Sequence, residues 1–426
     1  MRLSFCLFVF LFIVRQIFSQ NTVCFSEIKA PYMTVSPTIA EWENMDDVSL
    51  NNELDVFWTN ASKNGLPLVE KDSLYDDYVY VTFIYNSSET AVDVKLFIPG
   101  IYDENRFGDL KMYRLKNTGV YYRCYLLPDD VCMSYRFDVT DKKTGKTVKD
   151  LDRYNDNRIP KGERKDFSYS VLDLSRNHPD RNEQTHAGVD SRIDLFNINS
   201  RLLNNIRNVY VYLPPGYDGT ETYPAVWLFD AFVYMNRVEV PVVLDNLIAD
   251  GMIRPVIAVM FDNPTSESRY TEYALNFDFM NAFVSEFVPV VRERYTMSSN
   301  PADNIIGGMS YGGLNAAFIA FHHPGMFGKV LSQSGSFWRD LILKDTNGNE
   351  VRNDWLIRQF DTAVKRNLKL FLDWGLQENM VLGSNRTFVK VLNRKGYEFE
   401  FVEFDGWHNW ANTRKTFPVG LMYLMN

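Results

Sequence analysis

One pentapeptide constrains the fold of this chain more than any other stretch. Gly308-Met309-Ser310-Tyr311-Gly312 follows the apolar run Ile305-Ile306 and leads into the small residues Ala316-Ala317. This order predicts a buried strand, a tight turn and the start of a helix, with the Ser310 hydroxyl raised above the end of the strand. The residues two before and two after the serine must be small, because the strand and helix backbones nearly touch there. The alternative is a glycine-rich turn whose serine only caps the following helix.

Apolar segments alternate with helical ones on both sides of this turn. The expected strands are 209–213, 225–229, 256–261, 304–306, 330–332, 368–372 and 398–404. Continuous apolar strands separated by helices indicate a mostly parallel sheet that is covered on both faces. In such sheets the functional residues lie at the carboxyl ends of the strands.

Polar loops with an acid and a histidine follow two of the later strands. Asp373 and Glu378 come after Leu372, and His408 comes after Phe404. The chain order is therefore serine, acid, histidine. A serine needs a base to take its proton, an imidazole titrates in the right range, and a carboxylate holds the imidazole tautomer. The spacing alone leaves Glu378 and Asp373 open as the acid.

Backbone N–H groups are expected to complete this site by binding an oxyanion. One donor is the N–H of Tyr311, directly after the serine, and the other comes from the loop after Phe229, at Ala231 or Phe232. His178 and His186 are expected at the surface, since no further ligand residues accompany them. We expect neither a metal nor an organic cofactor.

The motifs resemble the enterochelin (enterobactin) esterase family, which is related to esterase D-like and feruloyl esterases. The matching stretches are Tyr210 to Tyr217, Leu228 to Ala231, Arg269 to Tyr273, Gly307 to Gly313, His323 to Gly328, Ser332 to Trp338 and Gly406 to Trp410. The resemblance implies an α/β-hydrolase fold and favours Glu378, three residues after Gly375, over Asp373. It also leads us to expect Arg269 and Glu272 on the substrate side, although an ion-pair role is the alternative for both. The implied substrate is a small-molecule ester.

The region before the catalytic half has a pattern that predicts β structure. Short strands rich in aromatic and β-branched residues, 78–85, 92–98, 120–126 and 132–139, predict a small immunoglobulin-like β-sandwich. The expected organisation is a signal peptide at 1–20, an N-terminal arm at 21–70, the sandwich at 71–165, a linker at 166–192 and an α/β-hydrolase domain at 193–426.

The start of the chain predicts a secreted protein. Arg2 precedes a short apolar run, and Ser19 is suitable for cleavage. An oxidising compartment permits a disulfide between Cys124 and Cys132, which would leave Cys24 as a free or intermolecularly paired cysteine. N-x-S/T acceptors for glycosylation occur at three positions, Asn60, Asn86 and Asn385.

Charge and composition narrow the class of function. The net charge of -9 argues against nucleic acid or an anionic membrane as the main partner. We therefore expect a secreted serine hydrolase that cleaves a carboxylic ester through an acyl-enzyme. The alternatives are an acyltransferase with the same three residues, a peptidase, or a non-catalytic binding protein on a hydrolase scaffold. The sequence does not reveal the oligomeric state.

Overall fold

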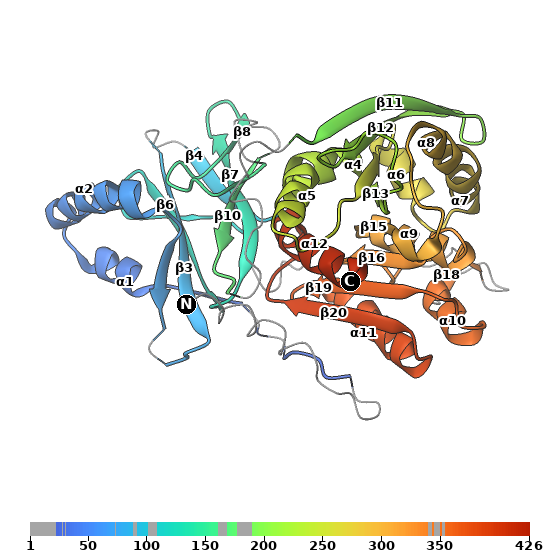
Figure 1. The fold of residues 1–426 in the computed structure, drawn as a ribbon. Coiled ribbons are helices and arrows are strands. Elements are labelled where there is room, and N and C mark those ends of the chain that lie inside the picture. Colours follow the sequence, from blue (N-terminus) through green and yellow to red (C-terminus); the bar gives the residue numbers. More distant parts are fainter. Residues whose placement is uncertain are drawn as a thin grey trace, which may run out of the picture.

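The chain folds into an N-terminal β region and a larger C-terminal α/β region, which lie side by side (Figure 1). The structure is a computed structural model that describes residues 23–426 except 28, 30, 73, 88–91, 101–108, 161–167, 177–189, 340–342, 345–349 and 352–353. The expected signal peptide, His178 and His186 lie outside the described residues. Within the described part of the chain, none of the helices combines the length and apolar character that a membrane crossing requires.

Two antiparallel sheets form the N-terminal region. The first sheet has the order β1 (Tyr32–Thr34), β6 (Val120–Pro128), β3 (Tyr78–Asn86) and β2 (Leu68–Lys71), with β5 (Tyr113–Arg114) also paired to β6. The second has the order β4 (Val92–Phe97), β7 (Cys132–Asp141), β10 (Tyr169–Asp173) and β9 (Arg158–Ile159), with β8 (Thr147–Asp150) also paired to β7. Both sheets contribute to one buried core that includes Phe83 and Tyr135, as the alternating aromatic pattern predicts. The immunoglobulin-like connectivity stays a prediction.

The boundaries of this region differ from the sequence expectation. Residues 21–70, expected to be an arm, contain α1 (Pro37–Asn44) and α2 (Asp47–Asn64) as well as β1 and β2. The apolar stripe of α2 is sparse, with Leu50, Leu54 and Ala61 buried in 18 residues, so its periodicity is weak in the sequence. The second sheet also extends beyond residue 165, because β10 pairs with β7.

The expected disulfide between Cys124 and Cys132 is absent. Cys124 lies in β6 of the first sheet and Cys132 in β7 of the second, and neither joins the other or the exposed Cys24. The prediction assumed that β6 and β7 pair as a hairpin, but the chain crosses from one sheet to the other between them.

One of the three glycosylation acceptors is inaccessible. Asn60 is exposed on α2 and Asn86 is half-buried at the end of β3. Asn385 in α11 is fully buried, and its side-chain amide donates to the carbonyls of Gly335 and Val381 at 2.7 and 2.9 Å. Asn385 is therefore excluded as a glycan site in the folded protein, and the other two stay predictions.

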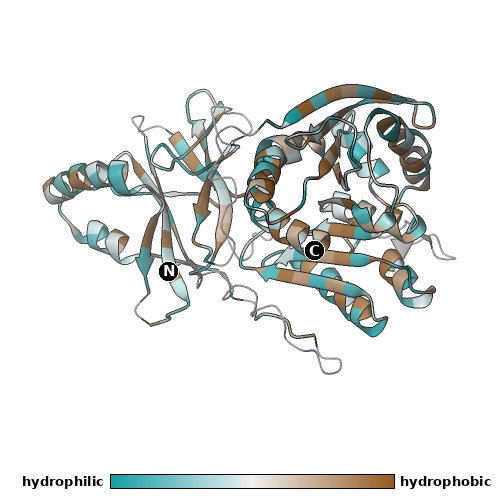
Figure 2. Cartoon of the chain, in the orientation of Figure 1, coloured by the Kyte–Doolittle hydropathy of each residue, from teal (hydrophilic) through white to brown (hydrophobic). Residues whose placement is uncertain are grey.

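An eight-stranded sheet organises the C-terminal region. Its order is β11 (Arg192–Ser200), β12 (Asn205–Leu213), β14 (Ile257–Phe261), β13 (Ala225–Phe229), β15 (Asn304–Met309), β16 (Lys329–Gln333), β19 (Lys369–Gly375) and β20 (Glu398–Phe404). The pairings from β14 to β20 are parallel, whereas β11 and β12 pair antiparallel, so the sheet is mixed at one edge. The bands along β11 in Figure 2 alternate between hydrophilic and hydrophobic, as its half-exposed position requires.

Helices cover both faces of this sheet. They are α4 (Ala231–Val233), α5 (Val240–Ala249), α6 (Ser266–Glu272), α7 (Phe277–Ala282), α8 (Val288–Arg294), α9 (Tyr311–His322), α10 (Trp355–Thr362), α11 (Asn379–Arg394) and α12 (Trp410–Met425). Alternate residues of β13 belong to different cores, Trp227 to one and Val226 to the other. A two-residue pair, β17 (Leu343–Lys344) with β18 (Glu350–Val351), lies between β16 and α10. The fold is therefore the expected α/β architecture.

Candidate active site

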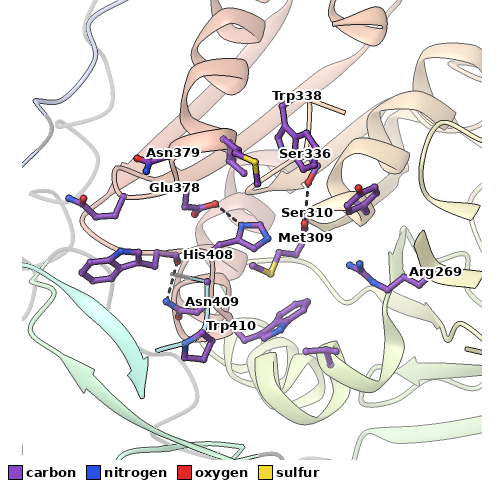
Figure 3. A pocket seen from close by; sticks show the side chains of 18 of the residues that line it. Arg269, Met309, Ser310, Ser336, Trp338, Glu378, Asn379, His408, Asn409 and Trp410 are labelled. Carbon is purple, nitrogen blue, oxygen red and sulfur yellow. Dashed lines mark hydrogen bonds and ion pairs between the residues drawn. The ribbon is translucent and has the colours of Figure 1, made fainter. Parts of the chain in front are cut away.

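The turn between β15 and α9 presents Ser310 at the carboxyl end of the central strand. The backbone of Ser310 is left-handed in φ, with φ 61° and ψ -119°, a conformation that costs a non-glycine residue energy. Its N–H donates to the carbonyl of Gln333 at 2.8 Å, which fixes the turn on β16. The Ser310 side chain makes no capping hydrogen bond to α9, and Ser310 lines a pocket instead (Figure 3).

The close approach of strand and helix explains the glycines, with one difference from the expectation. A Cβ on Gly308 would lie 2.7 Å from the carbonyl carbon of Gly312. A Cβ on Gly312 would meet its nearest atoms only at 3.5 Å, an ordinary contact. The tighter position is Gly313, where a Cβ would lie 2.7 Å from the Ser332 hydroxyl. Crowding thus requires a glycine before the serine and at Gly313, but not at Gly312.

His408 and Glu378 meet at the same edge of the sheet. His408 follows β20, and Glu378 follows β19 and occupies the position directly before α11. The His408 Nδ1 lies 2.6 Å from Glu378 Oε2, and Figure 3 shows the imidazole between Glu378 and Ser310. The Glu378 side chain is 1% exposed and that of His408 16%, so solvent screens their interaction little. The three residues that the sequence analysis selected are brought together.

The Glu378 carboxylate has hydrogen-bond donors on both oxygens. Oε1 accepts from the Ser334 hydroxyl and from the Gly375 N–H, each at 2.7 Å, and Oε2 faces His408. These bonds fix the rotation of the carboxylate, so Oε2 is directed at the imidazole.

Asp373, the other acid considered, points elsewhere. Its Oδ1 accepts from the Ser334 N–H at 3.1 Å, and its Oδ2 accepts from the Gln333 side chain at 3.2 Å. Complete burial raises the pKa of Asp373 to about 7, because the charged form loses its hydration. Of the two carboxylates, only Glu378 contacts His408.

A second hydroxyl, which the sequence analysis did not select, lies against the candidate nucleophile. The Ser310 Oγ is 3.1 Å from the Oγ of the buried Ser336, whose N–H also donates to the Ser310 carbonyl at 3.0 Å. In the described part of the chain no hydrogen bond joins Ser310 to His408. The available signal for Ser336 was its place in the Ser334-Gly335-Ser336 loop directly after β16.

The two expected oxyanion donors have different surroundings. Tyr311 is the first residue of α9 and lines the pocket, so its N–H belongs to the unpaired first turn of a helix. The N–H of Phe232 instead donates to Asp262 Oδ1 at 2.8 Å. In this structure a carboxylate from the loop after β14 thus occupies the N–H of Phe232, and the oxyanion role of Phe232 stays a prediction. Ala231, the first residue of α4, is the other candidate in that loop.

Arg269 and Glu272 are both held in ion pairs. Arg269 binds Asp230 through two bonds of 2.6 and 2.7 Å and also lines the pocket. Glu272 is 5% exposed, accepts from Arg207 at 3.0 and 3.2 Å, and is not among the pocket-lining residues. The expected substrate role of Glu272 is therefore wrong, whereas Arg269 combines the ion pair with a place at the pocket. Asp230 adopts a left-handed φ of 62° directly before Ala231, so its pairing with Arg269 holds the start of the loop after β13.

The pocket has a volume of about 590 Å³ and is lined by both polar and apolar side chains. Its aromatic members are Tyr270, Tyr311, Trp338, Trp407 and Trp410. Pro99 and Gly100 of the N-terminal region also line it. No group of three or more His, Cys, Asp or Glu side chains suited to a metal ion occurs among the described residues. The site thus offers a hydroxyl, an imidazole held by a carboxylate, and an aromatic cavity of small-molecule size.

Known proteins match this chain in sequence and fold. Residues 200–424, more than half of the chain, match the family model described as "Putative esterase". The ferric enterobactin esterase of Salmonella typhimurium has a similar fold, with a TM-score of 0.73 at 23% identity over 87% of this chain and 98% of that one. The iron(III) enterobactin esterase of Escherichia coli O6:H1 is 27% identical over 233 residues, which cover 53% of this chain and 55% of that protein.

A further relative is the endo-1,4-beta-xylanase/feruloyl esterase of Xylanibacter ruminicola, 27% identical over 220 residues, 49% of this chain and 27% of that protein. The chain spans about half the length of the first curated relatives that it matches. These matches confirm the resemblance to enterochelin esterases and the relation to feruloyl esterases. The chain belongs to the Esterase family.

Proposed function

We propose that this protein is a serine hydrolase that cleaves the carboxylic ester of a small molecule through an acyl-enzyme. The observation that carries the proposal is the hydrogen bond of 2.6 Å between His408 Nδ1 and Glu378 Oε2, beside Ser310 in one pocket. An imidazole held at Nδ1 by a carboxylate carries its proton there, so Nε2 is left free to accept one.

The reaction follows from these roles. Ser310 Oγ attacks the ester carbonyl carbon while His408 Nε2 takes the hydroxyl proton, and Glu378 stabilises the imidazolium. The tetrahedral oxyanion accepts hydrogen bonds from the N–H groups of Tyr311 and Ala231. Collapse breaks the bond to the alcohol, which leaves with the proton from His408. Water then attacks the acyl-enzyme by the same steps and releases the acid.

Two features favour a compact ester with an aromatic part. The pocket holds about 590 Å³ and has five aromatic side chains in its walls. The Arg269 guanidinium beside it is already paired with Asp230, which reduces its attraction for a free anion. The relatives are named for enterobactin and for feruloyl esters, so we include catecholate lactones and feruloyl sugars among the candidate substrates.

The test is hydrolysis by the purified protein. The panel contains p-nitrophenyl acetate, catecholate lactones and feruloyl sugars, and Ser310→Ala is the control. We expect wild type to release acid and alcohol and the variant to lose activity by several orders of magnitude. Equal activity in Ser310→Ala would refute the proposal. Products that carry the acyl group on an added alcohol, with no free acid, would indicate acyl transfer instead of hydrolysis.

We further propose that the protein is secreted, on the basis of the charged start and apolar run within residues 1–20. Expression of the full chain in its host, followed by N-terminal sequencing of protein from the medium, tests this. A new N-terminus near Gln20 supports secretion, whereas retention in the cells with Met1 intact contradicts it.

A further inference from the structure

The loop that carries His408 is enclosed by the N-terminal region. Residues 405–409 connect β20, the edge strand of the catalytic sheet, to α12. Trp407 and Asn409, the neighbours of His408, are each 2% exposed. An edge-strand loop is normally exposed and mobile, so the burial of this one requires a specific covering.

Trp407 belongs to the core of the N-terminal region rather than to either core of the catalytic sheet. Its indole is part of the cluster formed by residues of β3, β4, β6 and β7, among them Phe83, Met133 and Tyr135. A tryptophan buries more apolar area than most side chains, so it fixes the adjacent backbone strongly.

Hydrogen bonds join the same loop to β7. The Cys132 N–H donates to the Asp405 carbonyl at 3.2 Å, and Cys132 and Gly406 form a parallel bridge. The hydroxyl of Ser134 lies 3.4 Å from Asn409 Oδ1, which also caps α12. The loop is thus attached to the N-terminal region on both sides of His408.

Gly100 lies directly against the His408 backbone. This residue follows β4 in a turn with φ +82°, and a Cβ placed on it would lie 2.2 Å from the His408 carbonyl oxygen and 2.8 Å from its carbonyl carbon. Such an approach leaves no room for any side chain, so the position of the turn and the position of His408 are coupled.

We propose that the N-terminal region positions His408, and that Trp407 and Gly100 are the positioning residues. This inference rests on the proposed function, because it concerns the general base of that reaction. Neither residue reacts. Together they hold the His408 backbone, and with it the imidazole, in the pocket that also contains Ser310. A displacement of about 1 Å in such a site can cost about 10²-fold in rate.

The most direct test replaces Gly100 by alanine and compares it with Gly145→Ala. Gly145 has a similar φ of +70° and lies in the same region, but a Cβ there meets no atom within 4 Å. Both variants therefore carry a similar backbone strain, and only Gly100→Ala places a Cβ against His408. With p-nitrophenyl acetate, too small to depend on the distant pocket walls, we expect kcat of Gly100→Ala to fall about 10²-fold with KM nearly unchanged. Gly145→Ala should match wild type.

A double-mutant cycle separates positioning from a general structural effect. In the His408→Ala background, Gly100→Ala should cause no further loss of the residual activity, because the group it displaces is gone. A loss of equal size in both backgrounds, or equal kcat for Gly100→Ala and Gly145→Ala, would overturn the inference.

A second pair of variants keeps the test decisive if Gly100→Ala does not fold. Trp407→Ala and Phe83→Ala both empty the same core, but only Trp407 neighbours His408. At a temperature where thermal unfolding shows both to be folded, we expect Trp407→Ala to lower kcat at least tenfold more than Phe83→Ala, and Trp407→Phe to recover part of the loss. Equal kcat for the two alanine variants would refute the positioning role. If wild type itself showed no Ser310-dependent esterase activity, the proposed function would fail instead.

Discussion

Replacement of Glu378 by glutamine isolates the role of one atom. Glu378 Oε1 accepts from two donors, the Ser334 hydroxyl and the Gly375 N–H, both at 2.7 Å. The amide oxygen of glutamine must take that position, because an NH2 group there would face the Gly375 N–H, which cannot accept. The new NH2 is therefore directed at His408 Nδ1.

This arrangement imposes the wrong tautomer on the imidazole. Nδ1 must accept from the glutamine amide, so the proton moves to Nε2, and His408 can no longer take a proton from Ser310. The analogous exchange in a Ser-His-Asp protease costs about 10⁴ in kcat. We expect a similar loss here, which corresponds to about 5 kcal/mol in the activation free energy. The fold should persist, since the size of the side chain and the bonds at Oε1 are preserved.

The assay is steady-state hydrolysis of p-nitrophenyl acetate, with Asp373→Asn as the matched control. Asp373 is also buried at the end of β19, but it bonds to Gln333 and Ser334 rather than to His408. We expect Asp373→Asn to keep kcat within about tenfold of wild type. If Glu378→Gln stayed within tenfold of wild type, or if Asp373→Asn lost as much, the assignment of the acid would be refuted.

Three further predictions concern neighbouring groups. Ser336→Ala removes the 3.1 Å partner of Ser310 Oγ and should lower kcat/KM by roughly tenfold or less, the worth of one hydrogen bond; a loss of about a thousandfold would instead give Ser336 a part in the chemistry. Arg269→Ala leaves the buried Asp230 without its partner, so it should reduce the free energy of unfolding in urea by about 3 kcal/mol and also lower kcat. Glu272→Gln should leave kcat near that of wild type. Equal kcat for these two variants would contradict the different roles of Arg269 and Glu272. Burial raises the pKa of Asp373 from 3.8 to about 7, so the folded state binds this proton more tightly than the unfolded state does. The free energy of unfolding should therefore fall as pH rises from about 4 to 7, by at most roughly 4 kcal/mol relative to Asp373→Asn. Urea unfolding of both proteins across this pH range checks the sign, and a parallel pH dependence of the two would contradict it.

Local patterns were sufficient to predict the α/β class of the C-terminal region and the meeting of Ser310, Glu378 and His408. The strand, turn and helix around Ser310 depend on residues within a few positions of each other, and the order of strands places Glu378 and His408 at the same sheet edge. In a parallel α/β sheet the loops that follow the strands lie at one edge, so the strand that a residue follows predicts its place in the site.

Two departures from the expectations depend on partners far away in sequence. The N–H of Phe232 is occupied by Asp262, and Glu272 is paired with Arg207, neither of which a local motif records. The disulfide prediction failed because β6 and β7 enter different sheets. The helix α2 was missed because few of its residues face the core, so its periodicity was weak.

Labelling with a serine-directed fluorophosphonate tests the central claim most directly. The probe forms a covalent bond only with a serine hydroxyl that an adjacent base activates. We predict that wild type gains one probe per chain, that mass spectrometry of the peptides places it on Ser310, and that Ser310→Ala and His408→Ala are not labelled. Failure of wild type to react, or equal labelling of Ser310→Ala, would contradict the assignment of Ser310 as the nucleophile.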